Sequence, residues 1–193
     1  VETRSTPLVR DMKKTDLKQF DNTSYHPGSM AKRSLWYVVN VLFFNTSFPF
    51  SNSLKRMLLR LFGAKIGKGV ILKPKINIKY PWKLSVGNHS WIGEEVWIDN
   101  LGHVEIGANC CLSQGVMLLC GNHNFSVSRF DLIVGDIVLE EGVWLGAKSI
   151  VTPGVTCSSH AVLTVGSVAS KNLEAYSINR GNPAEKIKSR VIE

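Results

Sequence analysis

A six-residue rhythm runs through most of this chain, from Ile66 to about Ala169. Counting in sixes gives residue pairs at positions i and i+4, where the first member is aliphatic or Cys and the second is small or β-branched. The pairs are Ile66/Val70, Leu72/Ile76, Val86/Ser90, Ile92/Val96, Ile106/Cys110, Leu112/Val116, Leu139/Val143, Leu145/Ser149, Val151/Val155, Cys157/Ala161 and Leu163/Ser167. Gly often follows the first member, and we expect positive φ at these glycines.

This repeat excludes two simpler structures. An amphipathic helix needs apolar residues at helical spacing and few glycines, whereas this stretch is rich in Gly and β-branched residues. A single strand alternates for only about four to eight residues before a turn. A hexapeptide period predicts a parallel β-helix, in which three units close one triangular coil and inward aliphatic side chains stack from coil to coil.

The rhythm fails between Leu118 and Leu139, where 21 residues separate inward positions that are six apart elsewhere. We interpret about 119–136 as a loop inserted into the solenoid, and we expect the active site there because a rigid scaffold fixes the base of such a loop. The predicted organisation is an N-terminal arm with two helices over 1–65, the β-helix with its inserted loop over 66–170, and a C-terminal segment over 171–193.

Residues 34–50 place Leu35, Val38, Val39, Leu42 and Phe43 at helical spacing. The apolar run is too short for a membrane-spanning helix, which needs about 20 residues. Two interpretations stay open. The favoured one is a helix that caps the open first coil, because solenoid ends need covering. The other is peripheral membrane contact through 34–50, because a basic flank with aromatic residues is typical of membrane-surface helices.

A second helix is predicted to begin at Ser51 or Ser53 and to end at Gly63. Its expected apolar stripe consists of Leu54, Met57, Leu58, Leu61 and Phe62. Its expected solvated face consists of Lys55, Arg56 and Arg60. The first 30 residues lack periodicity and are interpreted as an extended arm.

The formal net charge of +8 indicates a polyanionic partner. No nucleic-acid motif or platform of aromatic and basic residues is present, so a small phosphate-bearing molecule such as coenzyme A or a nucleotide- or lipid-linked sugar is favoured over nucleic acid. The four cysteines show no disulfide framework, and we expect a cytoplasmic protein without a leader. Cys120 and His123 have zinc-ligand spacing but lack a second pair, so no metal is expected.

The repeat units IGKGVI, VGNHSW, IGEEVW, IGANCC, LGAKSI, VTPGVT and LTVGSV resemble those of the hexapeptide-repeat acyltransferases. GNH at 121–123, VWLGA at 143–147 and GNPAEKIKSR at 181–190 strengthen the resemblance, which covers about residues 30 to 190. LFGAKIGKGV at 61–70 and YPWKLSVG at 80–87 are similar to the colanic-acid branch from exopolysaccharide biosynthesis. The resemblance implies an all-β solenoid, a left-handed parallel β-helix with an N-terminal helical cap and a short C-terminal tail. It also implies a homotrimer in which His from one chain faces a coenzyme slot partly built by the next.

The same resemblance implies a reaction and a base. His123 matches the family's catalytic histidine and would take a proton from a sugar hydroxyl of an exopolysaccharide precursor as that hydroxyl attacks acetyl-CoA. Imidazole is suited to this because it titrates near neutral pH, although a structural role as a hydrogen-bond donor stays open. The partner of its other nitrogen is undetermined, with Asp131, Glu140 and Glu141 as candidates. Ser113 and the cysteines lack a recognisable base, which disfavours a covalent acyl-enzyme.

For the coenzyme, the resemblance implies contacts from the later coils: Trp144, Gly146, Ala147, Val165, Gly166, Ser170 and Lys171. A phosphate contact from Lys188 is a weaker expectation, because Glu185 stands where the family commonly has a basic residue. Asp99 and Asn100 are acceptor candidates or simply a solvated corner, and Trp144 is alternatively a packed surface aromatic.

Three further functions stay open: transfer of another acyl group, an amino-sugar or serine acceptor, and a non-catalytic or metal-binding β-helix. The last needs three histidines one coil apart. His89, His103 and His123 are instead separated by 14 and 20 residues, not by the 18 of a regular coil.

Overall fold

The computed structural model describes residues 13–193. The repeat region is a left-handed parallel β-helix of about six turns. Contacts divide the described residues into two compact units: 13–26 with Asn122–Ile133, and Pro27–Gly121 with Val134–Glu193. The predicted arm over residues 1–12 lies outside the described residues.

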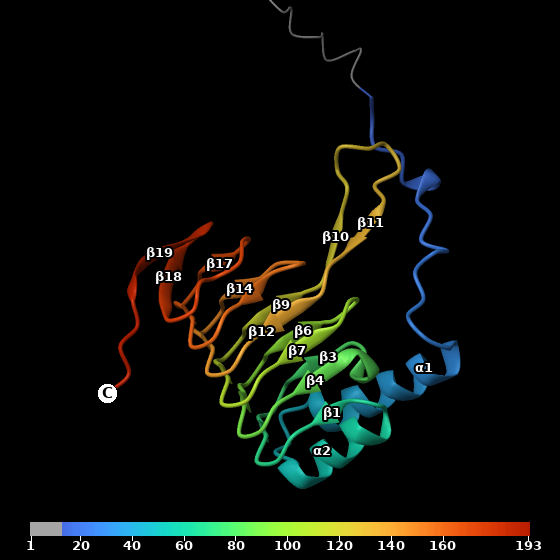
Figure 1. Ribbon diagram of the computed structural model, residues 1–193. Coiled ribbons are helices and arrows are strands. Elements are labelled where there is room, and N and C mark those ends of the chain that lie inside the picture. Colours follow the sequence, from blue (N-terminus) through green and yellow to red (C-terminus); the bar gives the residue numbers. More distant parts are fainter. Residues whose placement is uncertain (1–12) are drawn as a thin grey trace, which may run out of the picture. The chain divides into compact units, whose positions relative to one another are not determined.

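Three sheets form the solenoid in the larger unit, and Figure 1 shows their strands stacked turn upon turn. All their strand pairs are parallel except that of β18 with β19. Sheet A contains β1 (Lys65–Ile66), β4 (Leu84–Val86), β7 (Val104–Ile106), β12 (Ile137–Leu139) and β15 (Thr156–Cys157). Sheet B contains β2 (Ile71–Leu72), β5 (Trp91–Ile92), β8 (Cys111–Leu112), β13 (Trp144–Leu145), β16 (Val162–Leu163), β18 (Ser177–Gly181) and β19 (Ala184–Ser189). Sheet C contains β3 (Asn77–Ile78), β6 (Trp97–Asp99), β9 (Met117–Leu119), β14 (Ile150–Val151) and β17 (Val168–Ala169).

The predicted stack of inward side chains is confirmed, because every residue of the eleven sequence pairs is buried. In sheet A, Ile66, Val86 and Ile106 occupy one register and stack along the core. A buried serine fits this apolar core when its hydroxyl has hydrogen-bond partners. Ser90 Oγ, for example, donates to Gly107 O at 2.7 Å and accepts from Cys110 N at 3.0 Å.

One corner of the solenoid is longer than the hexapeptide rhythm predicts. Register partners in the early turns are 20 residues apart, as in Lys65 with Ser85, whereas Trp144 and Val162 are 18 apart. The additional residues lie between sheet C and sheet A, where the 3-10 helix η4 (Pro81–Lys83) connects β3 to β4. Between β9 and β12, the same connection contains the hairpin of β10 (Gly121–His123) and β11 (Leu132–Val134).

Glycine follows the inward residues for a different reason from the one we expected. Gly67, Gly87, Gly93 and Gly107 do not have positive φ, so that expectation is wrong. They are small because the next turn lies directly against them. A Cβ on Gly87 would lie 2.5 Å from Ala108 N. Positive φ occurs at other corner positions instead, including His89 and His160.

Two helices cover the first turn. The first is α1 (Met30–Val39), capped by Ser29 and continued by a π-helical turn, η3 (Asn40–Phe44), so the helix begins before the predicted residue 34. Trp36 is buried and its Nε1 donates to Ile78 O at 2.7 Å. The cap interpretation of this segment is therefore confirmed. Among residues 13–193, no helix has the length and apolar character needed to cross a bilayer.

The second helix, α2 (Asn52–Leu61), keeps Leu58 and Phe62 of the predicted stripe against the core, but it also buries one residue of the face that was expected to be solvated. Ser51 caps it as expected, but Lys55 is fully buried and Leu61 is 72% exposed. Lys55 Nζ donates to the carbonyls of residues 72 and 73. Arg56 and Arg60 likewise donate to the carbonyls of residues 66, 67 and 70.

The backbone explains why Lys55 is buried. In later turns, carbonyls such as Val86 O and Ile106 O accept from the preceding turn, through Gly67 N and Gly87 N. The corresponding carbonyls of the first turn have no preceding turn to pair with, and a buried unpaired carbonyl is costly. Long basic side chains reach these carbonyls, whereas an apolar stripe would leave them unpaired. Burial lowers the pKa of Lys55, which is consistent with its enclosed position.

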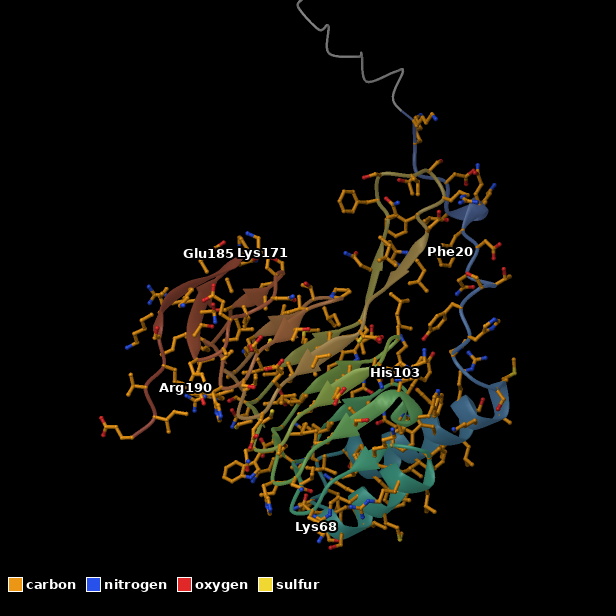
Figure 2. All side chains as sticks on the ribbon, in the orientation of Figure 1. Phe20, Lys68, His103, Lys171, Glu185 and Arg190 are labelled. Atoms are coloured by element: carbon orange, nitrogen blue, oxygen red, sulfur yellow. The ribbon has the colours of Figure 1, made fainter. Side chains whose placement is uncertain are left out.

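The C-terminal segment closes the other end. β18 pairs in parallel with β16, and β19 returns antiparallel to β18, so much of the expected tail is a strand. Arg190, labelled in Figure 2, donates to Gly142 O and His160 O, both at 3.1 Å. These bonds attach the end of the chain to earlier turns.

Candidate active site

His123 ends β10, the first strand of the inserted hairpin. Its Nδ1 lies 2.9 Å from Phe130 O, and its ring stacks on the Phe130 ring with centroids 4.4 Å apart and planes 8° apart. A carbonyl oxygen only accepts hydrogen bonds, so Nδ1 must carry the proton in the neutral ring. Nε2 then carries the lone pair, as a general base requires. Within residues 13–193, no hydrogen bond to Nε2 is found.

The hairpin backbone supports this arrangement. Asn124 N donates to Asp131 O at 2.8 Å across the loop. Phe130 has φ of +56°, an uncommon conformation for a bulky residue, and sites with such strain are often functional. The strained residue is the one whose carbonyl orients the imidazole.

A carboxylate partner for His123 is therefore wrong. Asp131 instead forms an ion pair with Arg129 at 3.0 Å. Glu140 accepts from Ser159, and Glu141 accepts from Asn109. The partner is a backbone carbonyl, which no side-chain pattern in the sequence could reveal.

The arm contacts the hairpin within the smaller unit. The 3-10 helix η2 (Leu17–Gln19) is preceded by Asp16, whose N–H donates to Ser128 O at 2.9 Å. Ser128 Oγ in turn donates to Lys14 O at 2.6 Å. Phe20, labelled in Figure 2, has its ring centroid 5.6 Å from that of His123. Two aromatic rings thus pack beside the imidazole, and sequence reasoning named neither of them.

Five of the predicted coenzyme residues lie on two stacked turns of the larger unit. Trp144 is in β13, and its Nε1 donates to Ser113 Oγ at 3.0 Å. Gly166 N donates to Ala147 O at 2.9 Å. A Cβ on Gly146 would lie 2.6 Å from Val165 N, so this position accommodates only Gly. Trp144 is about half exposed, and Val165 is 71% exposed, so apolar surface is available to a ligand here.

The remaining coenzyme candidates lie near the C-terminal end. Ser170 and Lys171 follow β17, and Lys171 Nζ lies 3.7 Å from Glu185 Oε1. Figure 2 shows these two side chains beside each other, so Glu185 partly compensates the charge of Lys171. Lys188 is exposed on β19, opposite Ile178 in the register. Its role in phosphate binding stays a prediction.

The two acceptor candidates differ in their surroundings. Asn100 is fully buried, and its side chain bonds to both the N–H and the carbonyl of Tyr80, at 2.9 and 2.6 Å. These bonds account for Asn100 as a structural residue of the corner. Asp99 Oδ1 lies 2.8 Å from Lys79 Nζ. Asp99 also lines a groove of about 850 Å³ between α1 and sheet C, together with Arg33, Tyr37 and Trp97.

Comparison with known proteins gives the family. No protein-family model matches the chain. Over 167 residues the chain is 38% identical to WcaF of Escherichia coli (strain K12), named as a colanic acid biosynthesis acetyltransferase, and the match covers 86% of this chain and 92% of WcaF. The chain belongs to the hexapeptide-repeat acetyltransferases. It is also 23% identical to galactoside O-acetyltransferase of Escherichia coli (strain K12), with 75% of this chain and 73% of that protein covered.

Solved structures of hexapeptide-repeat acetyltransferases have the same fold. The acetyltransferase VCA0836 from Vibrio cholerae superposes with a TM-score of 0.77 at 19% identity, covering 84% of this chain and 92% of that chain. A second structure of VCA0836, with acetyl coenzyme A, gives a TM-score of 0.76 at 19% identity, covering 84% and 88%.

The cysteines of this acetyltransferase are poorly suited to covalent catalysis. Burial raises the pKa of Cys110 to about 11 and those of Cys120 and Cys157 to about 12. Burial also raises the pKa of Cys111. The reactive form is the thiolate, so all four are weak nucleophiles at neutral pH. Within residues 13–193, no group of three or more His, Cys, Asp or Glu side chains is arranged to hold a metal ion.

Proposed function

We propose that this enzyme transfers an acetyl group from acetyl-CoA to a hydroxyl of a sugar in an exopolysaccharide precursor. The observation that carries the proposal is the bond between His123 Nδ1 and Phe130 O, which leaves Nε2 as the basic nitrogen. The similarity to WcaF supports the exopolysaccharide acceptor, and the fold shared with an acetyl-CoA-bound acetyltransferase supports the donor.

In the proposed reaction, His123 Nε2 takes the hydroxyl proton as the sugar oxygen attacks the thioester carbonyl. The new C–O bond forms a tetrahedral intermediate, whose oxyanion backbone N–H groups would stabilise. When the intermediate collapses, the C–S bond breaks and the proton on Nε2 passes to the leaving thiolate of coenzyme A. We assign the coenzyme to the surface around Trp144, Gly146 and Val165, with Ser170, Lys171 and Lys188 nearer the C-terminal end.

The direct test is a screen of nucleotide sugars and simple glycosides with acetyl-CoA, measuring the release of free thiol. We expect thiol release that depends on a hydroxyl-bearing acceptor, and mass spectrometry should find one acetyl ester on the product. Transfer only to amino sugars would contradict the O-acetyltransferase proposal. Thiol release that no sugar accelerates would also contradict it.

We further propose that the enzyme is a homotrimer. The support comes from the side chains that face outward from each sheet, which stack from turn to turn into one row per sheet. The row of sheet A is mainly polar: Lys65, Ser85, Glu105, Val138 and Thr156. The rows of the other two sheets are mainly apolar, namely Ile71, Trp91, Cys111, Trp144, Val162 and Ile178 in sheet B, and Asn77, Trp97, Met117, Ile150 and Val168 in sheet C. Two different apolar faces on one chain fit a closed ring in which one face packs on the other.

Sedimentation equilibrium should therefore give three times the chain mass of 21.4 kDa. Trp91→Glu puts a charge on the exposed row of sheet B, and we expect it to shift the mass toward that of a single chain. Ser85→Glu introduces the same charge on the polar row of sheet A and should leave the trimer unchanged. Equal dissociation by both variants would rule out this choice of faces.

We also propose a cytoplasmic location. The four cysteines are unpaired in the structure, which fits a reducing compartment.

A further inference from the structure

The helix α2 presents apolar side chains on the face that points away from the solenoid. Lys55 and Leu59 are fully buried against the first turn. Met57 and Leu61 follow each of them by two residues, which is a rotation of about 200° around the helix. Met57 is 49% exposed and Leu61 is 72% exposed. A helix packed on a core normally has polar residues on this outer face.

The first helix repeats this arrangement. Trp36 and Phe44 are buried against the first turn, and Asn40 bonds to Asn77 in β3. Val38 follows Trp36 by two residues and is 52% exposed, and Leu42 is 55% exposed in η3. Leu35 is also exposed. Both helices therefore have apolar residues on the face toward the core and on the face away from it.

The chain segment that contains these helices carries charge of a single sign. Between residues 22 and 93 there are eleven Lys and Arg residues and no Asp or Glu. Some of them have structural partners: Lys55, Arg56 and Arg60 bond first-turn carbonyls, and Lys75 and Lys79 pair with Glu95 and Asp99. Lys65, Lys68 and Lys73 are exposed on the first turn. Figure 2 shows Lys68 beside α2 at this end of the solenoid.

We propose that this end of the enzyme binds an anionic phospholipid surface. The end surface is defined by the apolar residues Leu35, Val38, Leu42, Met57 and Leu61 with the basic residues Lys65, Lys68 and Lys73. Apolar side chains on the outer face of a surface helix enter the boundary between lipid headgroups and acyl chains, and nearby lysines attract anionic headgroups.

Two observations favour a lipid over a second protein chain. Residues 22–93 contain no Asp or Glu. Protein interfaces usually pair charges of both signs, which this segment cannot do, whereas a uniformly anionic membrane surface matches it. The apolar rows of sheets B and C already provide the faces for contacts between copies. In a ring of parallel solenoids, the three end surfaces would also point the same way and bind one membrane together.

Vesicle flotation with the chain of 193 residues tests this proposal. The chain should float with vesicles of phosphatidylcholine mixed with phosphatidylglycerol and float far less with phosphatidylcholine alone, and added salt should weaken the binding. The double variant Leu42→Glu with Leu61→Glu should lower the bound fraction at least about tenfold, because two apolar side chains are replaced by charges that anionic lipid repels. Both positions are exposed, so the fold should persist, as circular dichroism will check.

The matched control is Val191→Glu with Ile192→Glu. These residues are 83% and 54% exposed at the opposite end of the solenoid, and the change in net charge is identical. This control should float like the unmodified chain. Equal loss in both variants, or no flotation of the unmodified chain, would overturn the proposal. A loss of the trimer mass in the Leu42/Leu61 variant would assign the surface to a second copy instead. Flotation does not depend on acetyl transfer, so the two proposals can fail separately.

Discussion

Replacing His123 by alanine is expected to lower the turnover number for acetyl transfer by about 10²–10⁴-fold. A sugar hydroxyl is a weak nucleophile at neutral pH unless a base takes its proton during attack. The Nδ1 bond to Phe130 O holds the imidazole with Nε2 available for this proton. The measurement is thiol release with acetyl-CoA and an acceptor found in the screen.

His103→Ala is the matched control for this variant. His103 is exposed, and its bonds to Asp136 Oδ1 and Ile137 N are made by its backbone N–H and carbonyl, which alanine retains. Its activity should stay within a few-fold of the unmodified enzyme. Both variants should keep the sedimentation mass and the circular dichroism spectrum of the unmodified enzyme. Full turnover in His123→Ala would remove His123 from the reaction.

Gly87→Ala is expected to have the largest effect on stability. The added Cβ would lie 2.5 Å from both Ala108 N and Gly107 C, distances that real side chains do not adopt. Relief would require two turns to separate, with loss of backbone hydrogen bonds such as Gly87 N to Ile106 O at 2.7 Å. We expect a loss in the free energy of unfolding above about 3 kcal/mol, comparable to severe overpacking, or failure to fold.

Gly154→Ala separates this steric cause from backbone conformation. Gly154 has φ of +81°, and no atom lies within 4 Å of the position of an added Cβ. Its cost should therefore be only about 1 kcal/mol, the conformational preference of Gly at positive φ. Denaturant unfolding of both variants at one protein concentration gives the comparison. Similar losses in the two variants would show that crowding between turns is unimportant.

The solenoid was predictable because its signal repeats. Each inward residue is weak evidence by itself, but eleven pairs at one spacing have few alternative structures. The repeat did not predict two details, namely the role of its glycines and the length of the early turns. Glycine at a fixed position suggested unusual dihedral angles, whereas the cause is the close approach of the next turn. The 20-residue length of the early turns depends on one corner, which in the first turn contains η4 (Pro81–Lys83).

Parts of the structure that depend on the backbone could not be predicted. Lys55 looked like a surface residue because sequence patterns treat charge as solvated, yet unpaired carbonyls of the first turn bind it in the interior. The orientation of His123 likewise depends on a carbonyl, so a search for carboxylates failed. The family motif did place Trp144, Gly146 and Val165 on neighbouring turns, because motif spacing in a solenoid translates directly into stacking.

The strand hydrogen bonds of the solenoid leave backbone groups to be paired at both of its ends. Every turn presents N–H and carbonyl groups at each edge, so identical turns would stack without limit into a filament. Nothing within the repeat itself stops this growth. At the first turn, growth ends where α2 supplies Lys55, Arg56 and Arg60 to the carbonyls, and Asn52 to the N–H of Leu72, in place of another turn. The length of the solenoid is thus determined by the segments that cover its two ends. Turns added between these segments would lengthen the solenoid without changing either end.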